Sequence, residues 1–285
     1  MPIYIHFFRQ NNLSKIDYTK ILDYFDTLAN FKSYVTDEYV EIAYSDIEFS
    51  FNYRYLITKQ SRVNRIYELS PKYTNVNFML EMPVMIPTFL AKEILTITQK
   101  ICKIFELDVY VDSFPDVQTF NLVDLLVLFE KTRSEYIESN GLNNKITFDN
   151  EKLNIVCKYQ RSVNSLKEYY NNEVDVKYVV PVVDPTNNVS GFSYSWQVGR
   201  ASVFPPYVEF IQVDDLEGNN LLVTRENFFR VMNKYFTEIK TFLPDLYVIK
   251  AKQAKATKKE IKKLRKYHNQ NYHFKSLRLC DVIEK

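Results

Sequence analysis

The sequence predicts an α+β fold of two units, each a mainly antiparallel sheet with helices on one face, followed by a basic C-terminal helix. Strand-like and helix-like patterns recur in both halves, and an Asn-rich stretch separates them. A chain of 285 residues suffices for two domains of ordinary size. We expect an N-terminal unit at 1–140, a C-terminal unit at 150–249 and a helical tail at 250–285.

The N-terminal half begins with an apolar strand at 3–8, and residues 17–28 then place apolar side chains at helical spacing. Residues 47–57 alternate apolar and polar side chains, which is the period of a half-buried strand. Pro87 stands where a helix over 88–105 would begin. The remaining expected elements are strands at 34–44, 77–82 and 107–111 and a helix at 122–137, with Asn121 as its cap.

The second half begins after the stretch 139–150, which is rich in Asn and contains one Gly, as in a linker. Prolines interrupt its strands, so some of these strands are edges or end in turns. We expect a helix at 151–170, strands at 174–183, 192–197 and 207–213, and a helix at 225–241.

The composition excludes several classes of function. The chain has only 4 Gly, all isolated, so it has no glycine-rich loop to cradle a nucleotide phosphate. Its 3 Cys include no C-x-x-C pair, which argues against a structural zinc site and a disulfide framework. The start of the sequence does not resemble a signal peptide, and no apolar run is long enough to span a membrane. We therefore expect a cytoplasmic protein without cofactor or metal.

No catalytic constellation stands out. Of the 3 His, His268 and His273 are five residues apart, which does not place them on one helix face, and His6 lies between apolar neighbours of the first strand. Asp214, Asp215 and Glu217 precede Gly218, and a polar turn explains them better than a metal site does. We expect a binding protein rather than an enzyme, although a site built from scattered carboxylates would leave no local motif.

Charge is divided sharply along the chain. Residues 1–249 hold 25 basic and 32 acidic side chains, whereas residues 250–285 hold 12 basic and 3 acidic ones. The tail is rich in helix formers, and no Pro or Gly interrupts it. The candidate partner-binding residues in it are Lys255, Lys258, Lys259, Lys262, Lys263, Arg265 and Lys266.

The tail has three interpretations. An acidic protein surface would attract the charges, while Ile261 and Leu264 would anchor an apolar seam. A nucleic acid would use the basic groups as phosphate contacts, with Tyr272 or Phe274 stacking on a base. The third interpretation is a solvated terminal helix, frayed or folded back on the acidic body. An anionic membrane fits less well because bulky apolar anchors are missing.

Trp196, the single tryptophan, alternates with Phe192 and Tyr194 along one expected strand. Such a ladder packs against a neighbouring strand or forms an exposed recognition platform, so Trp196 joins the candidate partner-binding residues. The leading hypothesis is a binding or assembly subunit that contacts another macromolecule, most simply a protein with an acidic surface, through this strand face and the basic tail. Nucleic-acid binding through the tail is the alternative.

Overall fold

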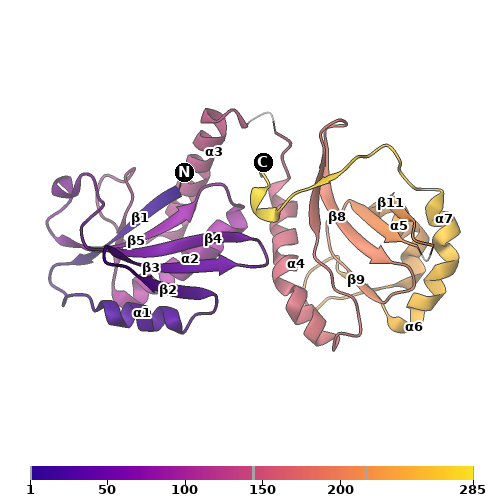
Figure 1. Ribbon diagram of the computed structural model, residues 1–285, viewed down its shortest axis with the longest axis horizontal. Coiled ribbons are helices and arrows are strands. Elements are labelled where there is room, and N and C mark those ends of the chain that lie inside the picture. The colour runs from indigo at the N-terminus through magenta and orange to yellow at the C-terminus, as the bar shows by residue number, and fades with distance from the viewer. Residues whose placement is uncertain (1, 143–144, 216, 285) are drawn as a thin grey trace. The chain divides into compact units, whose positions relative to one another are not determined.

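A computed structural model describes residues 2–142, 145–215 and 217–284, and it has the predicted α+β fold. The chain divides into two compact units, Met1–Asn144 and Lys145–Lys285. Residues 143 and 144 of the expected linker lie outside the described residues. Residues 250–285 belong to the second unit and do not form a separate part (Figure 1).

The first unit is built on a six-stranded sheet in the order β2-β3-β4-β5-β1-β6, and every neighbouring pair is antiparallel. Because β1 lies between β5 and β6, the connection between those two strands crosses over it. The strands are β1 (Pro2–Gln10), β2 (Phe31–Val35), β3 (Tyr39–Asp46), β4 (Phe51–Thr58), β5 (Tyr73–Pro83) and β6 (Asp108–Tyr110).

The helices α1 (Tyr18–Asp26) and α2 (Thr88–Phe105) pack against one face of this sheet, and α3 (Leu122–Ser139) packs against α2. The rings of Phe25 on α1 and Tyr55 on β4 lie 4.9 Å apart. Tyr55 Oη is 2.9 Å from Thr98 Oγ1 of α2. Asp17 and Asn121 cap α1 and α3, so the predicted cap of the third helix is confirmed.

The strand predicted at 47–57 begins later than expected, at Phe51. Residues 47–50 form the turn from β3, in which Asp46 accepts the Phe49 N–H at 2.8 Å and Ser50 has a φ of +56°. Alternation from Phe51 onward is observed, since Phe51, Tyr53 and Tyr55 are buried. The alternating residues at 47–50 belong to the turn, where Ile47 is exposed and Phe49 is buried.

The second unit contains a five-stranded sheet in the order β11-β10-β8-β7-β14 and a three-stranded sheet in the order β12-β13-β9. Only the β8–β10 pair among the described strands is parallel. The strands are β7 (Val180–Asp184), β8 (Val189–Gln197), β9 (Ser202–Phe204), β10 (Phe210–Asp214), β11 (Asn220–Thr224), β12 (Phe236–Glu238), β13 (Tyr247–Ile249) and β14 (Lys275–Ser276).

Two helices of this unit begin where expected. The helix α4 (Asn150–Tyr169) is capped by Asp149, and α5 (Arg225–Met232) is capped by Thr224. The prediction of one helix over 225–241 is wrong in its second half, where η3 (Asn233–Tyr235) leads into β12. The aromatic residues there satisfy a helical period, but the pairing of β12 with β13 determines the backbone.

The basic segment is helical in three consecutive pieces, α6 (Ala251–Ala254), η4 (Lys255–Glu260) and α7 (Ile261–Arg265). The chain then crosses the five-stranded sheet, adds β14 to its edge and forms η5 (Leu279–Asp281). It returns to the start of α4, where the Phe148 N–H donates to the Ile283 carbonyl at 2.8 Å (Figure 1). Among the described residues, no helix has the length and apolar character needed to cross a membrane.

Candidate functional site

The inner face of the basic helical segment is part of the core of the second unit. Ala254, Thr257 and Leu264 are buried at helical spacing, and the segment packs against α5. Thr257 Oγ1 accepts the Gly199 N–H at 3.2 Å, which ties η4 to the turn after β8. The basic segment is therefore folded back on the second unit.

A buried carboxylate holds the middle of the segment. Glu260 has a side-chain exposure of 3%, and its oxygens lie 2.7 Å from Lys234 Nζ and 2.8 Å from Lys263 Nζ. The Tyr235 hydroxyl donates to it at 2.9 Å. Hydrogen bonds from Lys234 and then Lys263 lower the pKa of Glu260 to about 2. The charge of Lys263 is therefore paired with Glu260, although the lysine side chain itself is exposed.

Two further buried carboxylates hold the end of the segment and the chain after it. Arg265 donates to Asp215 at 2.7 Å and also pairs with Glu217, so the acidic turn noted in the sequence is a docking point for the basic segment. The Arg265 guanidinium holds the pKa of Asp215 well below its usual range. The His273 N–H donates to Asp184 at 2.9 Å and lowers the pKa of that carboxyl to about 2.

The outer face of the same segment carries a row of lysines, which we call the lysine ridge. Successive members are three or four residues apart along the segment, and all are exposed, in contrast to the buried Ala254, Thr257 and Leu264. Within the part of the chain that the structure describes, their ammonium groups form no ion pair. The lysine ridge consists of Lys252, Lys255, Lys259, Lys262 and Lys266.

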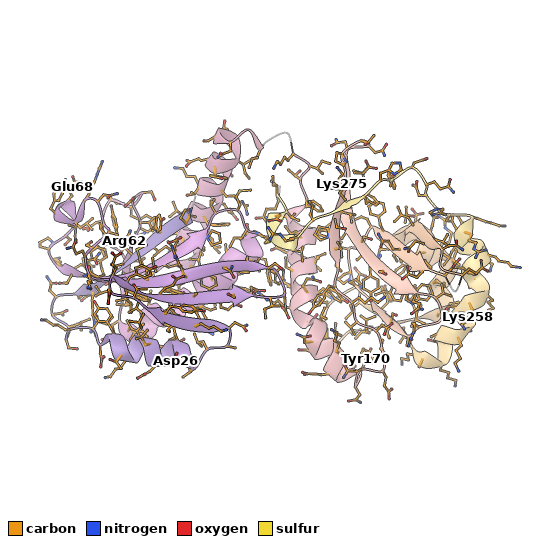
Figure 2. The ribbon with its side chains drawn as sticks, viewed as in Figure 1. Asp26, Arg62, Glu68, Tyr170, Lys258 and Lys275 are labelled. Carbon is orange, nitrogen blue, oxygen red and sulfur yellow. The ribbon has the colours of Figure 1, made fainter. Side chains whose placement is uncertain are left out.

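The predicted partner-binding residues are thus divided between two faces. Lys255, Lys259, Lys262 and Lys266 lie on the ridge, whereas Lys263 and Arg265 form the ion pairs described above. Lys258 is exposed on the same segment (Figure 2), and its aliphatic stem lies over Gly199. Sequence reasoning left out Lys252, although its position three residues before Lys255 would have placed it on the same helix side.

Trp196 does not belong to any exposed surface. Its exposed fraction is 0%, and its indole N–H donates to the Arg200 carbonyl at 3.1 Å. The ring packs against Phe204 of β9 and Phe228 of α5, at centroid distances of 5.9 and 5.3 Å. Of the two interpretations of the ladder, packing is the one observed. The expectation that Trp196 lies on an exposed recognition platform is wrong, because β9 and α5 cover that face.

The apolar groups expected to anchor a partner also point inward. Leu264 is fully buried and Ile261 is half-buried. Tyr272 and Phe274 pack on Phe210 of β10, with ring centroids 5.6 and 4.6 Å away. The surface that remains for a partner of this segment is therefore cationic and contains little apolar area.

Counting charge by structural unit gives a different division from the split at residue 249. Residues 145–285 hold 23 basic and 16 acidic side chains, a formal net charge of +7. Residues 1–144 hold 14 basic and 19 acidic ones, a net charge of −5. The acidity of the chain is thus concentrated in the first unit, and the ridge belongs to a unit that is itself positive.

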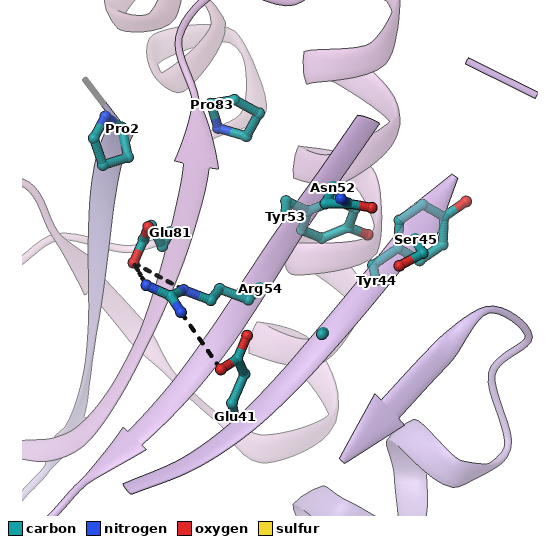
Figure 3. Close-up of a pocket in the computed structure, with 10 residues that line it drawn as sticks. Pro2, Glu41, Tyr44, Ser45, Asn52, Tyr53, Arg54, Glu81 and Pro83 are labelled. Carbon is teal, nitrogen blue, oxygen red and sulfur yellow. Dashed lines mark hydrogen bonds and ion pairs between the residues drawn. The ribbon is translucent and has the colours of Figure 1, made fainter. Parts of the chain in front are cut away.

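A hollow of about 530 Å³ lies on the exposed face of the sheet of the first unit. Arg54 lies at its centre and bridges two strands, with contacts of 2.9 Å to Glu81 and 3.4 Å to Glu41 (Figure 3). Arg54 pairs with both carboxylates, and the formal net charge of the three side chains is −1. The three side chains connect β3, β4 and β5, and we assign no chemistry to the hollow.

The remaining candidates for chemistry are the histidines and the cysteines. His6 is buried, and desolvation lowers its pKa. His268 Nδ1 accepts the Leu222 N–H at 3.0 Å and so covers the edge of β11. Cys102, Cys157 and Cys280 are buried and form no disulfide. Over the described ranges, no group of three or more His, Cys, Asp or Glu side chains is placed to hold a metal ion.

Comparison of the chain with protein-family models, with curated proteins and with solved structures finds no match.

Proposed function

We propose that this protein is a binding subunit that contacts the phosphate backbone of a nucleic acid through the lysine ridge. The observation that supports the proposal is the two-sided basic segment: its inner side is fixed in the core, and its exposed side presents five lysines that form no ion pair with any described residue. Because the row is already ordered, binding does not carry the entropic cost of ordering a flexible tail.

The spacing of the ridge suits a chain of phosphates. The ridge follows the length of the basic segment, and at about 1.5 Å per residue in the α-helical pieces and about 2.0 Å in the 3-10 helix the row spans roughly 20–25 Å. Lysine is a compact, flexible point charge that contacts phosphate without reading a base. We therefore expect binding that depends on salt and is indifferent to sequence.

The same surface fits an acidic protein less well. Protein interfaces have an apolar or aromatic centre and are depleted in lysine. Here Leu264, Tyr272 and Phe274 are used inside the unit, and few apolar atoms remain beside the ridge. A protein partner, the leading hypothesis from the sequence, would have to bind through charge alone.

Fluorescence anisotropy with a labelled single-stranded oligonucleotide tests the proposal. Neutralising the centre of the ridge with Lys255→Gln, Lys259→Gln and Lys262→Gln is expected to weaken binding at least tenfold at low salt. The matched control replaces three exposed lysines of α2 by glutamine, at Lys92, Lys100 and Lys103. The control is expected to bind like the natural chain.

Competition distinguishes the two partner classes. Unlabelled oligonucleotide is expected to displace the probe at far lower charge concentration than a polyglutamate peptide does. Equal loss of affinity in the ridge and control variants would contradict the proposal. So would retention of a protein, but of no nucleic acid, when the chain captures partners from lysate with and without nuclease.

A further inference from the structure

A small hollow of about 350 Å³ lies in the second unit, between the end of α4 and the turn after β8. It is open to solvent, and its lining is dominated by polar side chains. Three cations and one carboxylate surround it, together with two side-chain amides. These six residues are Lys167, Asn172, Asp175, Lys177, Gln197 and Arg200.

Neighbouring carboxylates among the described residues do not form ion pairs with the cations of this hollow. Among the described residues, neither Lys177 nor Arg200 forms an ion pair, and Lys167 Nζ lies over the Tyr178 ring at 5.4 Å from its centroid. Asp175 is the one carboxylate in the lining. The formal charge of the lining is therefore +2.

Rigid backbone positions the lining. The Asp175 N–H donates to the Ala201 carbonyl, and the Val203 N–H donates to the Asp175 carbonyl, both at 2.9 Å. The turn that presents Arg200 is held from the other side by Thr257, through the Gly199 N–H. Gly199 has a φ of +85°, and a side chain there would collide with the stem of Lys258.

We infer that this hollow is a subsite for a phosphomonoester, separate from the row of contacts that the ridge makes. A phosphomonoester carries a charge of about −1.5 to −2 at neutral pH, which matches the lining, whereas a phosphodiester carries one negative charge. The Arg200 guanidinium offers a planar fork to two phosphate oxygens, and the two lysines contribute point charges. The amides of Asn172 and Gln197 supply neutral donors.

Two sources present such a group: a free small phosphate compound, and the terminal phosphate of a nucleic acid lying on the ridge. The second source is considered because Lys258, which lies on the same basic segment as the ridge, is close to Gly199, next to Arg200. The subsite does not depend on the ridge proposal, since a free phosphate compound would fill it without any nucleic acid.

Two-dimensional amide NMR of the full chain, titrated with phenyl phosphate, tests the subsite. We expect saturable shifts at Gly199, Arg200 and Asn172, and at least fivefold weaker binding of the monoanion dimethyl phosphate. Arg200→Gln and Lys177→Gln are each expected to abolish the saturable shifts, and Lys262→Gln on the ridge is expected to retain them. Shifts confined to the ridge, or no saturation at millimolar ligand, would overturn the subsite.

Oligonucleotides with and without a 5′-phosphate then separate the sources. Tighter binding of the phosphorylated form, lost in Arg200→Gln, supports a nucleic-acid end. Equal affinity of the two forms alongside phenyl phosphate binding supports a free small phosphate compound. If oligonucleotides fail to bind while phenyl phosphate still binds the hollow, the ridge proposal fails and the subsite stands.

Discussion

The two units cover their sheets in different ways. In the first unit, α1 and α2 pack on one face, and loops cover part of the other around Phe8, Val63, Tyr110 and Val117, while the hollow at Arg54 remains open. In the second unit the C-terminal segment returns across the sheet and covers it with Tyr272 and Phe274. A segment that looks like an interaction tail is thus a layer of the fold, and only its outer side is available to a partner.

The units also differ in how they use carboxylates. The carboxyl groups with clearly lowered pKa values are Asp184, Asp215 and Glu260, and all three lie in the second unit. Each holds the C-terminal segment or is held by it. Both units bury clusters of aromatic rings, and in the first unit burial raises the pKa of Tyr55. The stability of the second unit should therefore depend more on acid.

Deleting residues 250–285 should have the largest effect. The second unit would lose its layer on β10, the ion pairs of Arg265 and the hydrogen bond between Phe148 and Ile283, so it should not fold. The first unit should keep its fold, because its core is formed within residues 1–144. Limited proteolysis with mass spectrometry would show one protected fragment from the first unit, and equal protection of both units would contradict this expectation.

Trp196→Ala should destabilise the second unit by about 3–5 kcal/mol, the usual cost of removing a large buried aromatic side chain. Trp196→Phe should cost less because it refills part of the space. Tyr34→Ala on the exposed edge strand β2 is the control in the first unit and should change the free energy of unfolding by less than about 1 kcal/mol. Urea unfolding followed by circular dichroism measures all three, and similar midpoints for Trp196→Ala and Tyr34→Ala would contradict the burial of the indole.

Acid should unfold the second unit before the first. The pKa values of Glu260 and Asp184 in the folded state are about 2, below their values in an unfolded chain. Their contribution to stability is therefore present above about pH 5 and is lost as the pH falls toward 2. Amide hydrogen exchange between pH 5 and 2.5 should show protection lost first in residues 145–284. Glu260→Gln should reduce this dependence, and unchanged acid sensitivity in that variant would refute the role of Glu260.

Arg54→Ala should have the smallest effect, about 0.5–1 kcal/mol on the first unit. Its ion pairs with Glu41 and Glu81 are partly exposed, and such pairs contribute little. Thermal unfolding of the variant measures this, with Arg54→Lys as the charge-conserving control. A loss above about 3 kcal/mol would show that the hollow around Arg54 is more tightly coupled to the core than its exposure indicates.

Local pattern was sufficient for the fold class and for most helices, because caps such as Asn121 and the period of β4 are local signals. Local pattern failed where contacts between residues distant in the sequence determine the structure. The ion pair between Arg265 and Asp215 joins positions 50 residues apart, and β12 exists because of its pairing with β13. The composition of the tail indicated a cationic surface, but only the packed structure separates the ridge from Lys263 and Arg265, whose charges are paired with carboxylates.

The salt dependence of oligonucleotide binding tests the central claim most directly. For the natural chain, the logarithm of the association constant should fall linearly with the logarithm of salt concentration. Replacing Lys255, Lys259 and Lys262 by glutamine should flatten that slope by about 2, at roughly 0.7 per lost single-strand phosphate contact, with unfolding unchanged. An unchanged slope in a folded variant would contradict the claim that the ridge binds phosphate.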